Sequence, residues 1–287
     1  METAAKNKMA LIGLYTVGFY IFMALFAPLL PVYPYEEQYL AHIYLPPSFK
    51  PAGEVLLSQK RAYTAKLMAK EKRSEYTEQE RAEFEALERD IQTNPMHKRH
   101  YLLGTDSLGR DVLSRTIYGG RISIAIGLLG TVTALFIGVT LGAVAGYAGG
   151  WIDSALMRFV DIMYGLPYML IVIIMMAILG RNIFILFIAI ALISWLTIAR
   201  VVRGQIISLK NSEFVEAARS MGASSGRIIF KHLLPNTLGI IIVYSTLSMP
   251  SFIMSESFLS FLGLGVSAPL ASWGSLVSDG VKGMELY

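Results

Sequence analysis

Long apolar runs alternate with polar segments along this chain, and several of the runs have the length of membrane-spanning helices. A helix needs roughly 20 residues to cross a hydrocarbon core of about 30 Å. Five runs approach or reach that length, at about residues 9–30, 122–144, 159–179, 183–199 and 238–254. A further apolar stretch, 258–266, is glycine-rich and too short to span, which predicts a re-entrant or interfacial segment. The pattern therefore predicts an all-α integral membrane protein with five spans in this chain.

Local features refine three of these runs. The first follows Lys6 and Lys8, but its length exceeds that of a signal-peptide core, so it predicts an anchored helix. In the second, Gly138 and Gly142 stand four residues apart, the small-residue spacing that lets two membrane helices approach closely. The third and fourth runs are separated only by residues 180–182. That short connection predicts that they are antiparallel neighbours.

The polar region between the first two runs, residues 31–121, has a different composition. Within residues 54–92 there are nine acidic and eight basic side chains. Apolar residues recur there at helical spacing, and Thr77 with Glu80 forms a capping box that would start a second helix. We expect two short charged helices in a hairpin. A solvated hairpin without chemistry and a contact with substrate or a receptor both remain open.

Composition and charge agree with a membrane protein and predict its orientation. Hydrophobic residues make up 54% of the chain and charged residues only 16%, against about 25% charged in soluble domains. The net charge of +4 comes mostly from basic residues beside the apolar runs. The polar loop between the fourth and fifth runs is strongly basic, which predicts a cytoplasmic loop. Counting spans then places the N-terminus in the cytoplasm, and residues 31–121 and the segment after Met254 outside.

The sequence shows no set of residues typical of an enzyme. It has no cysteine, no phosphate-binding P-loop, no His-Glu-x-x-His and no Gly-x-Ser-x-Gly. His97 and His100 could clip a metal, but no carboxylate ligand is close in sequence, so an ordinary polar loop is favoured. We interpret Asp153, Arg158 and Asp161 as an ion-pair set at a helix end rather than a proton relay, with Arg158 as the partner of Asp161. We predict no catalytic, cofactor or metal site.

The basic loop holds the most informative segment. Asn211 or Ser212 can cap a helix, and Gly222 can supply the left-handed residue that stops it about ten residues later. Phe214 provides a bulky apolar group on that helix, and the pair Ala217 and Ala218 keeps one side thin. A short helix of this kind suits docking into a groove of a partner protein.

Three blocks resemble the permeases of ATP-binding-cassette (ABC) importers. Residues 216–235 resemble their EAA loop, although His232 stands where isoleucine is usual. Residues 103–123 and 257–279 are similar to blocks of the oligopeptide/dipeptide branch, closest to its C-type subunit. The first resemblance is carried by Glu216, Ala217, Ala218, Arg219, Gly222, Leu234 and Pro235, and the bulky Phe214 belongs to the same helix. The family's outer block corresponds here to Gly104, Asp106, Gly109, Arg110 and Asp111.

The resemblance implies a fold, a function and partners. It implies a type I importer permease with three parts: residues 1–30 with the first span, the external insertion 31–121, and the transmembrane domain 122–287. That domain would contain the coupling loop 200–237 and the outer loop 255–287. The resemblance also implies peptide import across the bacterial cytoplasmic (inner) membrane, with a homologous second permease, two ATPase subunits and an external binding protein. ATP and magnesium would bind the ATPase subunits and not this chain.

The sequence departs from the family pattern in two respects. The family has a sixth helix after the outer loop, so we expect roughly 30–45 further residues beyond Tyr287, about one span and a tail. The charged hairpin is longer than the family norm, and no role carries over to it. The cargo stays open among oligopeptide, dipeptide, modified peptide and nickel chelate.

Overall fold

A computed structural model describes residues 8–180, 182–266 and 269–284. These residues form helices and connecting loops, and their only strand-like contacts are two isolated bridges. The chain divides into two compact units. One comprises Met1–Gly120, Pro269–Ala271 and Leu276–Tyr287, and the other comprises Arg121–Ala268 and Ser272–Ser275. Each is described by itself below.

The first unit begins with an apolar helix and contains the charged hairpin. Its elements are α2 (Lys8–Leu25), η1 (Ala27–Leu29), η2 (Leu40–His42), α3 (Ala52–Glu71), α4 (Glu78–Thr93), η3 (Pro95–Lys98) and the first residues of α5 (Val112–Ala148). Helix α2 ends earlier than the predicted run, because Pro28 cannot continue an α-helix and instead lies in the 3₁₀ turn η1. The rest of the predicted run, to residue 30, is therefore not α-helix.

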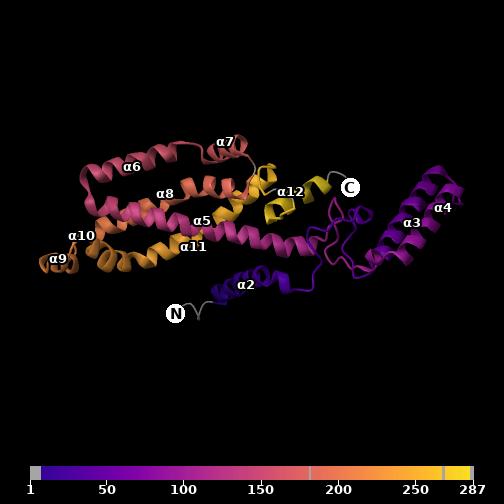
Figure 1. Ribbon diagram of the computed structural model, residues 1–287, viewed down its shortest axis with the longest axis horizontal. Coiled ribbons are helices and arrows are strands. Elements are labelled where there is room, and N and C mark those ends of the chain that lie inside the picture. Colours follow the sequence, from indigo (N-terminus) through magenta and orange to yellow (C-terminus); the bar gives the residue numbers. More distant parts are fainter. Residues whose placement is uncertain (1–7, 181, 267–268, 285–287) are drawn as a thin grey trace. The chain divides into compact units, whose positions relative to one another are not determined.

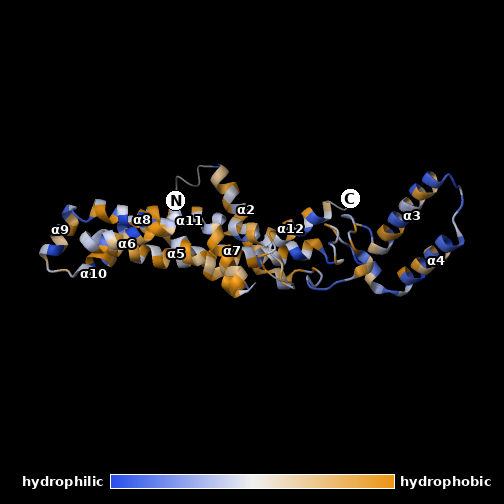
Figure 2. Cartoon of the chain, turned by 90° about the horizontal axis from the view of Figure 1, so that it is seen from above, coloured by the Kyte–Doolittle hydropathy of each residue, from blue (hydrophilic) through white to orange (hydrophobic). Residues whose placement is uncertain are grey.

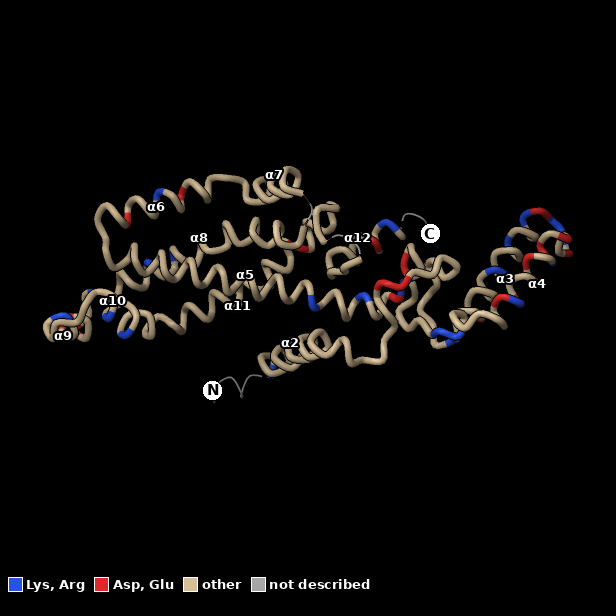
Figure 3. Tube along the Cα trace, in the orientation of Figure 1, with Lys and Arg blue, Asp and Glu red and all other residues tan. Residues whose placement is uncertain are grey.

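The expected helical hairpin is present as α3 and α4. Thr77 accepts a hydrogen bond from the backbone of Glu80, and the Glu80 side chain accepts one from the backbone of Thr77, which completes the predicted capping box. Arg73 also binds both Glu80 oxygens, and these bonds lower the pKa of Glu80 to about 2. Figure 3 shows both acidic and basic residues on these two helices.

The second unit contains most of the apolar helices. They are α5, α6 (Gly150–Gly165), α7 (Tyr168–Leu179), α8 (Ile183–Leu209) and α11 (Leu234–Phe261), with the short elements α9, α10 and η4 between α8 and α11 (Figure 1). Hydropathy colouring shows α5, α7 and α8 as mainly apolar and α3 and α4 as mainly polar (Figure 2). Among the described residues of both units, four helices are long and apolar enough to cross a membrane, or up to five if the bent pair α6–α7 is one span.

Glycines allow α5 to lie against its neighbours, as the spacing of Gly138 and Gly142 predicted. A methyl group added at Gly138 would stand 2.8 Å from the carbonyl oxygen of Trp195 in α8, and one at Gly142 would collide with the carbonyl of Ala199. Gly130 lies in the same way against the Phe252 ring of α11. Because the obstacles to Gly138 and Gly142 include backbone, only glycine fits there.

The boundaries of the other four predicted spans were wrong as well. The second, predicted for residues 122–144, belongs to α5, which begins at Val112 and ends at Ala148. The third is broken at Pro167 into α6 and α7, which are bent by 78°. The fourth continues as one helix to Leu209, well into the predicted loop. The fifth begins at Leu234 and continues to Phe261, so residues 258–261, predicted to be re-entrant, belong to its last turn. Helices α7 and α8 do pack as neighbours, as their short connection predicted.

The partner predicted for Asp161 was also wrong. Asp161 binds Arg200 of α8 at 2.7 Å, and Asp153 binds Arg203 of the same helix at 2.5 Å. Arg158 forms no ion pair with a described residue. The acids of α6 thus pair with a different helix, and the ion pairs join α6 to α8.

Candidate functional site

Helix α9 (Glu213–Ser220) lies in the basic loop where the sequence predicted a bounded helix. Its start follows Ser212, whose hydroxyl donates to the carbonyl of Leu209 instead of capping the new helix. Its end has the predicted left-handed glycine, since Gly222 has φ +78°. The amide of Ala223 donates to the carbonyl of Ala218, and that of Gly222 to the carbonyl of Arg219, which is the Schellman arrangement.

One side of α9 is buried in the chain and the other is exposed. Val215 and Ala218 are buried in the core of the second unit. Phe214, Glu216 and Ala217 are exposed, together with Glu213, Arg219 and Met221. The sequence analysis placed Ala217 and Ala218 together on a thin side suited to docking into a partner; this was wrong for Ala218, because its methyl group packs inward with Val215. The rest of α9 is exposed, and Phe214 together with Met221, directly after the helix, are the large apolar side chains there.

A π-helical turn joins α9 to α11. After α10 (Ser225–Arg227), residues Ile228–Leu233 form η4, and the amide of Leu234 donates to the carbonyl of Ile229, five residues earlier. Pro235 has no amide hydrogen, so it cannot make the next helical bond. The side chain of Asn236 instead donates to the carbonyl of His232 at 2.6 Å. Leu234 and Pro235 thus mark the entry to α11, and π-helical turns of this kind are frequent at functional sites.

The outer block folds into a tight polar turn in the first unit, before α5. One oxygen of Asp106 accepts from the backbone amides of Leu108 and Arg110, both at 2.9 Å. Gly104 and Gly109 have φ +76° and +70°, and a side chain at either would collide with a backbone carbonyl. Asp111 caps α5 by accepting from the amide and hydroxyl of Ser114. The five predicted block residues therefore come together, with local structural roles.

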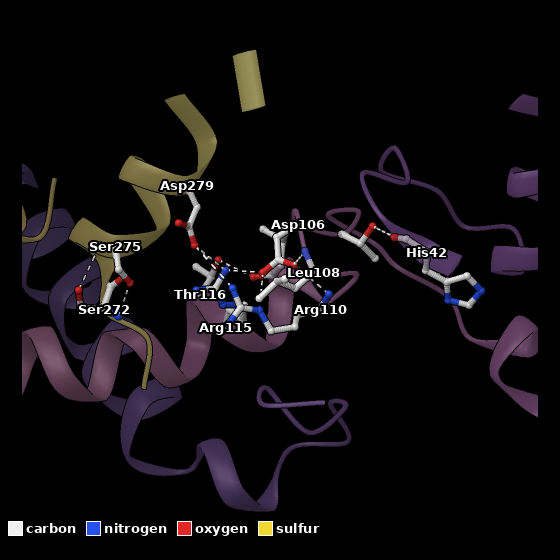
Figure 4. Close-up of polar contacts among 11 residues, drawn as sticks. His42, Asp106, Leu108, Arg110, Arg115, Thr116, Ser272, Ser275 and Asp279 are labelled. Carbon is white, nitrogen blue, oxygen red and sulfur yellow. Dashed lines mark hydrogen bonds and ion pairs between the residues drawn. The ribbon is translucent and has the colours of Figure 1, made fainter. Parts of the chain in front are cut away.

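Two arginines and two aspartates hold this turn together inside the first unit (Figure 4). The other oxygen of Asp106 accepts from Arg110 at 2.7 Å and from Arg115 at 2.5 Å. Arg115 also reaches Asp279 of α12 (Trp273–Met284) at 3.1 Å. A cavity of about 350 Å³ adjoins the cluster. The sequence did not single out Arg115 or Asp279, because nothing local relates positions so far apart.

Glu256 is a buried acidic residue that the sequence analysis missed, because it lies beyond the predicted end of the fifth span. It is fully buried in α11. Its oxygens accept from Ser123 of α5 at 3.2 Å and from Ser260 at 2.7 Å. Ser123 in turn accepts from the backbone amide of Trp273 at 3.1 Å. Among the described residues Glu256 has hydroxyl partners and no ion pair, and a buried acid in a membrane helix is a candidate for function.

The histidines lie differently from the prediction. His97 does have a carboxylate neighbour, Asp90, at 2.8 Å, and its second ring nitrogen bonds His42 at 2.9 Å. His100 instead bonds the backbone carbonyl of Phe49. Within the part of the chain that the structure describes, no group of three or more His, Cys, Asp or Glu is placed to hold a metal.

Comparison with known proteins identifies related chains. The family described as "binding-protein-dependent transport system inner membrane component" matches residues 138–284, more than half of the chain. The "N-terminal TM domain of oligopeptide transport permease C" matches residues 4–47. The oligopeptide transport system permease protein OppC of Bacillus subtilis is 38% identical over 282 residues, 98% of this chain and 76% of that protein. OppC of Haemophilus influenzae is 50% identical over 192 residues, 67% of this chain.

This chain spans only part of the length of its relatives. The match spans 62% of the Haemophilus protein and 63% of OppC of Escherichia coli K12, which is 48% identical. A solved structure, described as an inward-facing conformation of the MetNI methionine ABC transporter, has a TM-score of 0.46 and 18% identity and covers 61% of this chain and 89% of that one. That similarity is too low to carry an argument. The family match, with the relatives, establishes the expected class: this chain belongs to the inner membrane components of binding-protein-dependent transport systems.

Proposed function

We propose that this chain is a permease subunit of an ATP-driven peptide importer in the bacterial cytoplasmic membrane. It forms half of the translocation pathway beside a homologous permease. It takes peptide from an external binding protein and is driven by two ATPase subunits that bind ATP and magnesium. Relatives named as oligopeptide and dipeptide permeases support the substrate class.

The geometry of α9 carries this proposal. A helix bounded at both ends presents Phe214, Glu216 and Ala217 on its exposed side. Its opposite side is buried through Val215 and Ala218 in the core that also contains residues of α8 and α11. A push on the exposed side is therefore transmitted to packed spans, because a close-packed core moves as a body. We place an ATPase groove on this exposed side, so that ATPase closure drives alternating access.

Coupling between α9 and the ATPase can be tested by substituting two glycines, of which one has a positive φ and the other does not. Both Gly222 and Gly226 have open space where a side chain would go, but only Gly222 has a positive φ. Gly222→Val should strain the end of α9 by roughly 1–2 kcal/mol, while Gly226→Val should not. We expect Gly222→Val to lower ATP-driven peptide uptake severalfold in vesicles containing the assembled transporter, with Gly226→Val near the parental rate.

A second pair of variants tests contact itself. Ala217→Trp places a large ring on the exposed side of α9, whereas Ala86→Trp places one on the exposed side of α4. We expect Ala217→Trp to co-purify with less ATPase or to hydrolyse ATP without uptake, and Ala86→Trp to behave like the parent. A full ATPase complement and parental uptake in both Gly222→Val and Ala217→Trp would show that α9 is not the coupling element.

The proposed orientation has its own test. The chain contains no cysteine, so single cysteines can be labelled without background. With the N-terminus in the cytoplasm, Glu75→Cys should react with an impermeant maleimide added to intact cells, and Ser220→Cys should react only after permeabilisation. The reverse pattern would refute the orientation and leave the coupling test unaffected.

A further inference from the structure

Two imidazole rings are buried together at the base of the α3–α4 hairpin. His42 and His97 are 0% and 1% exposed. His42 belongs to η2, ahead of the hairpin, and His97 belongs to η3, directly after α4. The pair therefore joins the segment that leads into the hairpin to the segment that leaves it.

The rings form the centre of a continuous hydrogen-bonded chain. Tyr101 lies 3.1 Å from Nδ1 of His42, Nε2 of His42 lies 2.9 Å from Nδ1 of His97, and Nε2 of His97 lies 2.8 Å from Asp90. With both rings neutral, each nitrogen has one role: Tyr101 donates to His42, His42 to His97, and His97 to Asp90. Every bond in the chain is then satisfied without a charge on either ring.

The chain can hold only one additional proton. If His97 becomes charged, His42 can change tautomer and accept from it, while Asp90 balances the charge. If both rings are charged, all four ring nitrogens are donors and two N–H groups face each other across 2.9 Å. The bond between the rings is then lost, and two like charges are buried side by side, which is strongly unfavourable.

Most of the surroundings of His42 lower its pKa. Burial has the largest effect, followed by His97 and then the Arg99 guanidinium, and together they lower the pKa of His42 from 6.5 to about 4. Asp90 opposes them weakly. Arg99 is itself held by Glu37 at 2.8 Å.

Among the residues that the structure describes, the remaining neighbours add no carboxylate beside His42 other than Asp90. Tyr39 packs edge-on against both imidazoles, and burial raises the pKa values of Tyr39 and Tyr101, so both phenols stay neutral. Helix α3 presents Gly53 to His97, where an added methyl group would lie 3.1 Å from Cβ of His97.

We propose that the His42–His97 pair is a proton-sensitive latch, closed when at least one ring is neutral and released when both are charged, which loosens the base of the hairpin. The sign follows from linkage. The unfolded segment takes a proton on His42 near pH 6.5 and the folded one only near pH 4, so the closed form weakens as pH falls through that window. With the orientation proposed above, the latch responds to external pH, but its test does not depend on orientation.

Hydrogen exchange of the full chain in lipid nanodiscs tests this, after correction for the intrinsic pH dependence of exchange. From pH 7.5 to pH 5 the opening equilibrium at the base, residues 50–57 and 94–101, should rise about 30-fold. At the tip, the Arg73–Glu80 pair holds the pKa of Glu80 at about 2, so residues 68–82 should show no such change. Equal protection of the base at both pH values would overturn the proposal.

Two matched variants identify the side chain whose titration causes the pH response. His42→Gln removes the titrating ring and should abolish the pH response, while His100→Gln, at an exposed histidine outside the pair, should retain it. An unchanged response in His42→Gln would assign it to other groups and refute the latch. If the His42→Gln variant is unprotected from exchange even at pH 7.5, nitrogen NMR of the parent protein with labelled histidines tests the proposal instead. The His42 ring should remain neutral at pH 5.5, and a charged ring at that pH would also refute the latch.

Discussion

Two helix pairs in this molecule are held together by opposite means. Helices α3 and α4 are linked mainly by charged side chains, with Lys60–Glu83 at 3.0 Å and Arg61–Glu88 at 3.1 Å. Helices α5 and α8 lie together because Gly138 and Gly142 bring backbone against backbone. Ion pairs between flexible side chains tolerate change, since each is exposed and screened. Backbone contact does not, because neither side can move aside. The pairs should therefore respond very differently to substitution.

The largest loss of stability should come from a substitution among buried charges. This substitution tests whether the α3–α4 hairpin tolerates change because its contacts are charged or because they are exposed. Arg115→Ala leaves Asp279 without its closest partner and Asp106 with one fewer. We expect a loss of roughly 3 kcal/mol in unfolding free energy, the scale for breaking a buried pair. Denaturant titration in mild detergent measures it. A loss below about 1 kcal/mol would place this cluster with the exposed pairs.

Substitution in the close contact between α5 and α8 should destabilise the protein nearly as much as the loss of Arg115. Gly142→Leu forces a side chain into the Ala199 backbone and should cost about 3 kcal/mol, the upper end of typical overpacking. Gly239→Leu in α11 is the matched control, because nothing lies within 4 Å of that position. The same titration compares them. Equal stability of the two variants would mean that the α5–α8 contact is not close in solution.

Loss of the hairpin cap should have an intermediate effect. Thr77→Ala removes one of the two reciprocal bonds at the start of α4 and should cost about 1 kcal/mol locally. Hydrogen exchange at residues 78–82 reports this. Acid should weaken the start of α4 only at low pH. The stabilisation from Glu80 is complete above its ordinary pKa of 4.5 and is lost as pH falls through about 2. Fraying of these amides already at pH 4 would contradict the Arg73–Glu80 pair.

The smallest effect should come from an exposed ion pair between the hairpin helices. Arg61→Gln removes the partner of Glu88, and both side chains are about half exposed. We expect a loss of at most about 0.5 kcal/mol, which vanishes in high salt. Thermal unfolding of the hairpin region at low and high salt checks both points. A large, salt-independent loss would show that charge pairing is not what distinguishes the hairpin from α5 and α8.

Features that depend on nearby residues were predicted well from the sequence. The capping box of Thr77 and Glu80 and the left-handed Gly222 both formed as expected, because a cap or a stop signal acts on residues within one turn. The glycine spacing on α5 likewise identified a contact face. Four of the five predicted spans correspond to helices long and apolar enough to cross a membrane, although their ends shifted; the third is broken at Pro167 into the bent pair α6–α7.

Features that depend on distant residues were not predictable from spacing. Asp161 pairs with Arg200, 39 positions away, and not with nearby Arg158. Ala217 and Ala218 are adjacent and chemically identical, yet only the packing of α9 decides that Ala217 is exposed and Ala218 buried. Glu256 and Ser123 meet across 133 positions. No local pattern contains such pairings.

The sequence by itself determined the class of molecule: apolar runs long enough to span a membrane, a charged hairpin, and a bounded helix in a basic loop. Apolar length, charge and capping act locally, so they can be read along the chain. Only the tertiary structure decided which charges meet, that His42 and His97 share a buried bond, and which side of α9 is free. Those outcomes depend on what is excluded from water when helices pack, and that depends on distant neighbours.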